Sequence, residues 1–205
     1  MTDIEQFMEQ LSSSSPVPGG GSVAALQCAM AAALLAMVAN LTVGRKKYAD
    51  VAESAIQIRD EAVALRTGAS RLADADVEAY GNVSQVLEMP RDTDEQKARR
   101  RTRMQTALKG AVEPPLQTMQ TASRILDLAA ELMMIGNKSA ISDVGTAAGA
   151  ARSGFDGALL NVEINLASIE DSAWVQDVRS TLAGFPPVAE RADAIARHIL
   201  AVIRS

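Results

Sequence analysis

One carboxylate stands out among the side chains that could do chemistry. Over residues 47–87 apolar side chains recur every three or four positions, and Asp76 occupies a position where this stripe calls for an apolar one. Its neighbour Asp74 lies off the stripe. Burial raises the pKa of a carboxyl group and suits it to general acid or base chemistry. The position would also suit half of a structural ion pair with a buried Arg or Lys, and the pattern leaves both interpretations open.

A glycine loop offers a second kind of chemistry. Gly19, Gly20 and Gly21 precede Ser22, which we expect to cap the uncharged helix that follows. A helix start presents unpaired N–H groups and partial positive charge, and glycines allow a carbonyl or anionic ligand to approach them. The loop is not a P-loop, because no Gly-Lys-Ser/Thr follows at the required spacing. A tight turn required by packing would explain the glycines equally well.

Further polar residues interrupt the second half of the chain. Asn161 and Asn165 are four apart, so they share one face of an otherwise apolar helix and need partners, which could be a ligand. Asn137 lies in a turn. Ser142 and Asp143 follow it at an expected helix start, where capping alone would also select them.

Two groups of basic residues could likewise serve either the fold or a ligand. Lys46 and Lys47 follow the uncharged helix, where cations complement the helix dipole. The cations of residues 97–103 are spread around a helix, which is typical of a solvated face. Either group could instead contact a polyanionic ligand tail.

Composition excludes several classes of function. A chain that is 48% hydrophobic but only 3% aromatic favours close-packed helices over sheets. The net charge of -5 argues against general nucleic-acid binding. With one cysteine, Cys28, and one histidine, His198, the chain can form no internal disulfide and no ordinary zinc site. The acidic N-terminus lacks the features of a secretory signal, so we expect a reducing, cytoplasmic location.

The elements that must position these residues are all expected to be helices. Residues 23–43 are long and apolar enough to span a membrane, but their alanine content and the polar Gln27 and Asn40 favour a central buried helix. The pattern predicts an all-α bundle of long antiparallel helices in a single domain, residues 1–205. The first expected helix is residues 3–11, capped by Thr2 and Glu5. A later helix is capped by residues 93–96 and broken at Pro114–Pro115, and the helix after that break ends at residue 135. The other expected helices are residues 23–43, 47–87, 142–169, 171–183 and 188–204.

Six segments in a fixed order resemble one known family. They are PVPGGGSVAAL, MVANLTVGRKKY, DADVEAY, MPRDTDEQKARR, GNKSAISDVGTAA and LLNVEINL. Over residues 7–171 the chain resembles the cyclodeaminase/cyclohydrolase family of folate enzymes, which includes stand-alone methenyltetrahydrofolate cyclohydrolases and the cyclodeaminase domain of formiminotransferase-cyclodeaminase.

The resemblance implies a helical homodimer with a folate cleft near the glycine loop and the dimer interface. It places the catalytic aspartate on Asp76, and Asp143 is the next candidate. The expected substrate-binding residues are Pro18, Gly19, Gly20, Gly21, Ser22, Asn40, Lys46, Lys47, Asn137, Ser142, Asn161 and Asn165. We expect no metal, no cofactor beyond the folate substrate, and neither nucleic acid nor membrane as a partner.

Two folate reactions fit this resemblance. A cyclohydrolase would hydrate 5,10-methenyltetrahydrofolate to 10-formyltetrahydrofolate, with Asp76 activating the water. A cyclodeaminase would release ammonia from formiminotetrahydrofolate through a similar tetrahedral carbon. We expect the cyclohydrolase, because no formiminotransferase segment accompanies the domain. A non-catalytic helical dimer or scaffold is the alternative of another class.

Overall fold

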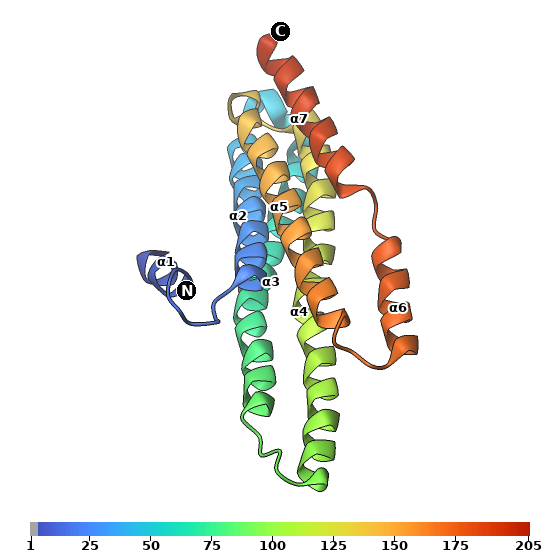
Figure 1. Ribbon diagram of the computed structural model, residues 1–205. Helices are drawn as coiled ribbons and strands as arrows, with labels where there is room; N and C mark the ends of the chain where they lie inside the picture. Colours follow the sequence, from blue (N-terminus) through green and yellow to red (C-terminus); the bar gives the residue numbers. More distant parts are fainter. Residues whose placement is uncertain (1–3) are drawn as a thin grey trace.

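The protein is a bundle of α-helices. The computed structural model describes residues 4–205, and no strand occurs in that range. The α-helices are α1 (Ile4–Leu11), α2 (Gly20–Thr42), α3 (Ala52–Leu87), α4 (Asp94–Ile135), α5 (Ile141–Leu166), α6 (Ser172–Ala183) and α7 (Val188–Arg204). Two short 3₁₀-helices, η1 (Lys46–Val51) and η2 (Lys138–Ala140), connect some of them. Figure 1 shows α2, α3, α4 and α5 side by side, with α1 and α6 standing away from them.

The long helices are antiparallel. α2 begins close to Asn161, in the C-terminal half of α5. It ends beside Asn137, which precedes α5 and donates its side-chain N–H to the Leu41 carbonyl. α5 therefore runs opposite to α2, and the predicted all-α bundle of long antiparallel helices is confirmed.

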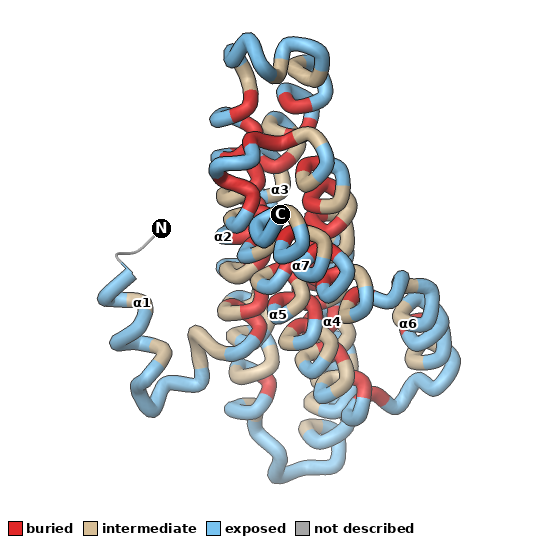
Figure 2. Tube along the Cα trace, turned by 90° about the horizontal axis from the view of Figure 1, so that it is seen from above, coloured by how far each residue is buried: buried red, intermediate tan, exposed pale blue. Residues whose placement is uncertain are grey.

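α2 is the central helix of the bundle and contacts α3, α4 and α5. Its buried side chains are mostly alanines, with Leu35 and Val38 fully buried among them, and Figure 2 shows this buried interior in red. A Cβ at Gly154 of α5 would lie 2.6 Å from the Cys28 Sγ, so the two helices pack too closely for a larger residue. By length and composition α2 could cross a membrane, yet 61% of its most apolar window is buried inside the bundle.

The apolar stripe of α3 faces this core, as the sequence predicts. Ala55, Ile58 and Ala62 are buried, whereas Asp74 is exposed. Asp76 is half-buried on the inward side. α3 begins five residues later than expected, because η1 occupies Lys46–Val51.

The break predicted at Pro114 and Pro115 is wrong, because α4 runs through both prolines. Prolines lack the N–H that would bond to the carbonyl four residues earlier, and they normally kink or end a helix. Here the side chain of Asn165 on α5 donates to the Ala111 carbonyl (3.0 Å), which is the carbonyl that Pro115 leaves without a partner. The carbonyl that Pro114 leaves free belongs to Gly110, an exposed residue.

Several helix starts test the predicted caps. The capping box of Thr93 and Gln96 is confirmed at the start of α4. Thr2, the expected cap of α1, lies outside the described residues. α5 begins at Ile141 with no side-chain cap, so Ser142 is not the cap, and Asp143 lies in the first turn.

Candidate active site at the start of α2

The Asp76 carboxylate lies directly against the first turn of α2. The helix begins at Gly20 with Gly19 as its N-cap, so the expectation that Ser22 caps it is wrong. The glycines themselves supply the extended N-cap and the first turn. A Cβ at Gly21 would lie only 2.1 Å from the Asp76 Oδ1, closer than any real contact. Glycine at this position is therefore what lets the carboxylate reach the helix backbone.

Ser22 is the polar partner of Asp76. Its buried hydroxyl lies 3.0 Å from the Asp76 Oδ2 and 3.2 Å from the Ala73 carbonyl oxygen. Burial raises the pKa of the Asp76 carboxyl, and hydrogen bonds from the Ser22 hydroxyl and backbone N–H oppose that rise. The net pKa shift is upward, the direction that suits a proton acceptor working near neutral pH.

The structural ion pair considered for Asp76 is not present. Among residues 4–205 no ion pair includes this carboxylate. α2, against which it packs, has no charged residue between Gly20 and Thr42. Asp76 is thus a desolvated carboxylate held by a hydroxyl and a helix N-terminus rather than by a cation.

Asn161 and Asn165 lie in the last turns of α5, at the end of the bundle where α2 begins. A Cβ at Gly20 would be 3.5 Å from the Asn161 Nδ2, so this amide borders the glycine turn. Asn161 donates to the Gly157 carbonyl (2.8 Å), and Asn165 donates to the carbonyls of Ala111 and Asn161. Both N–H groups of the Asn165 amide are therefore used by the helices, whereas Asn161 uses one of its two N–H groups in this way and its Nδ2 borders the glycine turn. Gly19, Gly20, Gly21, Ser22, Asp76, Asn161 and Asn165 are therefore gathered at one place, next to Pro18.

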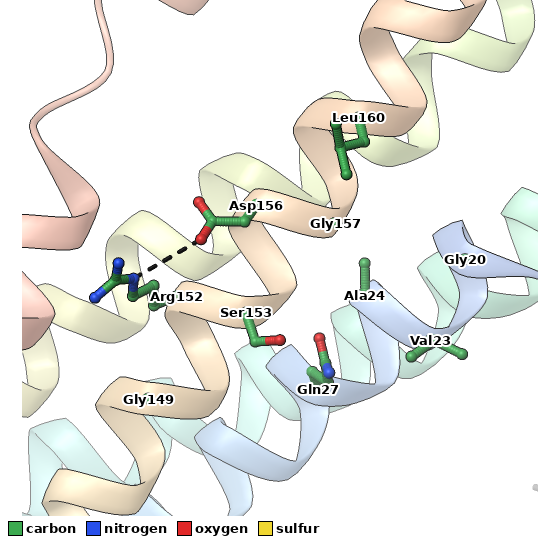
Figure 3. Close-up of a pocket in the computed structure, with 10 residues that line it drawn as sticks. All are labelled: Gly20, Val23, Ala24, Gln27, Gly149, Arg152, Ser153, Asp156, Gly157 and Leu160. Carbon is green, nitrogen blue, oxygen red and sulfur yellow. Dashed lines mark ion pairs between the residues drawn. The ribbon is translucent and has the colours of Figure 1, made fainter.

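A groove between α2 and α5 opens beside this place. It measures about 390 Å³, starts at Gly20 and continues past Gln27 and Ser153, whose side chains point toward one another (Figure 3). Asp76 does not line it, and neither does Gly21, against which the carboxylate packs. Neither Gln27 nor Ser153 is among the site residues predicted from the sequence. The available signal was Gln27 itself, a polar side chain in an uncharged apolar helix.

The remaining predicted residues lie at the opposite end of α2. A helix of 23 residues is about 35 Å long, so this second group is remote from Asp76 within one chain. Asn137 is buried and forms hydrogen bonds within the fold. Its backbone N–H donates to the Thr42 hydroxyl, and its side-chain oxygen accepts from the Ser139 N–H. The far-end group consists of Asn40, Lys46, Lys47, Asn137, Ser142 and Asp143.

Other reactive groups do not add to the site. Burial raises the pKa of the Cys28 thiol to about 12, so the thiolate needed for nucleophilic chemistry is disfavoured. His198 lies on α7, a helix that packs on α4 and α5. Within residues 4–205 no three His, Cys, Asp or Glu side chains are grouped so that they could hold a metal ion.

A family model described as formiminotransferase-cyclodeaminase matches residues 3–184, most of the chain. The chain belongs to this family. The resemblance on which the sequence analysis relied is therefore confirmed.

Relatives of the formiminotransferase-cyclodeaminase family differ in length. The chain is 38% identical to a methenyltetrahydrofolate cyclohydrolase of Methylorubrum extorquens, over 98% of this chain and 96% of that protein. It is 34% identical to a formimidoyltransferase-cyclodeaminase of Sus scrofa, over 88% of this chain but 33% of the relative. The crystal structure of a formiminotetrahydrofolate cyclodeaminase from Thermotoga maritima superimposes with a TM-score of 0.82 and 26% identity, covering 98% of this chain and 96% of that one.

Membership of the formiminotransferase-cyclodeaminase family adds to the geometry without replacing it. Asp76 is the residue that the helical pattern, the burial and the resemblance all select. The role of each site residue in binding or catalysis stays a prediction.

Proposed function

We propose that the protein is a methenyltetrahydrofolate cyclohydrolase that interconverts 5,10-methenyltetrahydrofolate and 10-formyltetrahydrofolate. The observation that carries the proposal is a desolvated carboxylate, Asp76, which is placed against a helix N-terminus and forms no ion pair within residues 4–205. The M. extorquens cyclohydrolase, which matches over nearly the whole of both chains, supports this reaction in particular.

Asp76 has the properties that the hydrolysis requires. The methenyl group that bridges N5 and N10 is a delocalised cation, and an adjacent carboxylate stabilises its charge. A carboxylate whose pKa is raised accepts a proton from the attacking water more readily. The tetrahedral adduct then opens by breaking the bond between its carbon and N5; the adduct hydroxyl loses its proton and N5 takes one up, which leaves the formyl group on N10. The N–H groups of the first turn of α2 are available to carbonyl groups of the folate.

We also propose that the protein acts as a homodimer. The face that α2 and α5 share contains exposed apolar side chains, and α2 has no charged residue. We call this the α2–α5 face; its exposed apolar members are Met30, Met37, Leu41, Leu160 and Ile164. Exposed apolar surface of this kind is typical of protein interfaces. A second copy with its α2 antiparallel would bring the far-end group, including Lys46 and Lys47, to the glycine turn of its partner.

The dimer can be tested at one exposed leucine. Leu160 is 71% exposed and lines the groove of the α2–α5 face, so Leu160→Lys should yield monomers in analytical ultracentrifugation. Met134, 67% exposed on α4, is the matched control, and Met134→Lys should leave the dimer intact. A Leu160→Lys protein that sediments like the unmodified protein would place the interface elsewhere.

The cyclodeaminase reaction is the second candidate. It is favoured by the likeness to the T. maritima cyclodeaminase, a chain of similar length that matches throughout. The purified protein should therefore be assayed separately with 5,10-methenyltetrahydrofolate and with formiminotetrahydrofolate, and ammonia release should be followed in the second assay. Turnover of the methenyl compound alone supports the cyclohydrolase. Ammonia release as the main activity would replace it with the cyclodeaminase.

The Asp76→Asn variant tests the catalytic assignment in whichever assay is active. General-base catalysis contributes on the order of 10²–10⁴-fold, and turnover should fall by that amount while folate binding persists. Near-normal turnover would exclude Asp76 and direct attention to Asp143. Turnover of neither folate by the unmodified protein would favour the non-catalytic scaffold. We further propose a cytoplasmic protein with neither metal nor membrane requirement, so that activity should survive chelators and purification without detergent.

A further inference from the structure

Ser22 is placed to control the geometry of Asp76. It is only 1% exposed, and its hydroxyl joins α2 to α3 through two acceptors, the Asp76 Oδ2 at 3.0 Å and the Ala73 carbonyl oxygen at 3.2 Å. A residue this deeply buried has little surface to offer a folate. Its polar group faces the carboxylate instead.

The two acceptors matter because a hydroxyl has one proton to donate. When Asp76 is ionised, the charge-assisted bond to Oδ2 is the stronger of the two. When Asp76 is protonated, the hydroxyl can turn its proton to the Ala73 carbonyl and accept the carboxyl proton. Neither protonation state then leaves a buried hydroxyl without a partner, and this lowers the cost of a proton moving on and off Asp76.

The two carboxylate oxygens consequently have different surroundings. Oδ2 accepts a hydrogen bond from the Ser22 hydroxyl. Oδ1 is the oxygen that a Cβ added at Gly21 would meet first, at the first turn of α2. We propose that Ser22 is a positioning residue that holds Oδ2 and so fixes the orientation in which the Asp76 carboxylate meets the water and the one-carbon unit of the substrate. The inference rests on the proposed catalytic function of Asp76.

Few charged groups surround this pair. α2 contributes no charged residue. On α3, Tyr80 is a titratable residue one helical turn after Asp76. On the neighbouring helices, the Glu113 carboxylate of α4 accepts a hydrogen bond from the Gln117 side chain. Glu163 of α5 forms an ion pair with Arg179 at 3.6 Å. In the described part of the chain no hydrogen bond or ion pair joins either glutamate to Asp76. The Ser22 hydroxyl is therefore the side-chain contact whose loss should change Asp76 most directly.

Ser22→Ala tests this directly, with Thr118→Val as the matched control. Thr118 is also a buried hydroxyl, but it donates to the Pro114 carbonyl within α4. The Asp76 carboxyl is titrated by ¹³C NMR, its signal identified by its absence from Asp76→Asn. Its pKa should rise in Ser22→Ala and stay unchanged in Thr118→Val. Ser22→Cys, a weaker donor, should give an intermediate pKa, and it also serves if the alanine variant does not fold.

Kinetics supply the second measurement. In Ser22→Ala the acidic limb of the pH profile should move to higher pH. kcat should fall on the order of tenfold to a hundredfold, as expected for the loss of one hydrogen bond to a charged group, with little change in KM. An unchanged Asp76 pKa in both Ser22 variants would overturn the inference. If the unmodified protein turns over neither folate, the proposed function fails, while the NMR titration still decides the role of Ser22.

Discussion

Gly21→Ala should reveal how closely the site is built. A Cβ at position 21 would lie 2.1 Å from Oδ1, 2.5 Å from Cγ and 2.7 Å from Oδ2 of Asp76. Ordinary contact begins near 3.4 Å, so the carboxylate would have to retreat by about 1.3 Å. Catalytic geometry is sensitive to that distance, because a displacement of about 1 Å can cost roughly 10²-fold in rate. We therefore expect turnover to fall by about two orders of magnitude.

The neighbouring glycine provides the control. At Gly20 the nearest atom to an added Cβ is the Asn161 Nδ2 at 3.5 Å, an ordinary contact. Both substitutions place alanine, the better helix former, in the first turn of α2, so their effects on helix stability should be alike. Turnover and KM are measured for both variants, together with thermal unfolding followed by circular dichroism. Gly20→Ala should keep a much higher turnover than Gly21→Ala, because only the Cβ added at position 21 displaces the carboxylate.

The outcome that refutes this reasoning is specific. If Gly21→Ala folds and keeps turnover within about threefold of the unmodified protein, a shift of about 1 Å in Asp76 is harmless and the carboxylate is not the proton acceptor. Equal loss in both variants would instead indicate that any side chain in this turn blocks the substrate.

Two further predictions concern stability. The pKa of Asp76 is raised in the folded state, so its contribution to stability is full at low pH and is lost as pH rises through the folded-state pKa. Asp76→Asn should therefore raise Tm at pH 7, by an amount that shrinks toward pH 4. A lowered Tm at pH 7 would contradict the inference that burial destabilises the ionised Asp76 carboxylate. Gly154→Ala would place a Cβ 2.6 Å from the Cys28 Sγ and 2.8 Å from the Ala24 carbonyl oxygen, which should lower the free energy of unfolding by about 1–3 kcal/mol in urea titrations. Gly81→Ala, with open space around it, should be neutral or stabilising by up to about 1 kcal/mol, and equal losses in the two glycine variants would argue against the tight α2–α5 contact.

Local patterns in the sequence were sufficient for most of the helices. The spacing of apolar residues gave the inward face of α3, and Gly44, with a φ of +78°, ends α2 as glycine commonly does. Thr93 and Gln96 formed the predicted capping box because that motif involves only neighbouring residues. These features depend on contacts within a few positions, which the sequence displays directly.

The failure at Pro114 and Pro115 has the opposite cause. A proline pair predicts a break because the missing N–H groups leave carbonyls without partners. One of those carbonyls is satisfied by Asn165, which lies 54 residues from Ala111 along the chain and on another helix. No local pattern indicates that contact. The same contact explains one of the amides that the sequence analysis had assigned to the substrate.

The sequence by itself determined that Asp76 is a carboxylate on an apolar face, because helical periodicity is a local property. Only the tertiary structure decided what that carboxylate meets. Packing of α2 on α3 brought Gly21 and Ser22 to it across more than 50 residues, and α2 itself contributes no cation. It also separated Lys46 and Asp143 from this site by about the length of α2, because antiparallel helices place the two ends of each helix far apart.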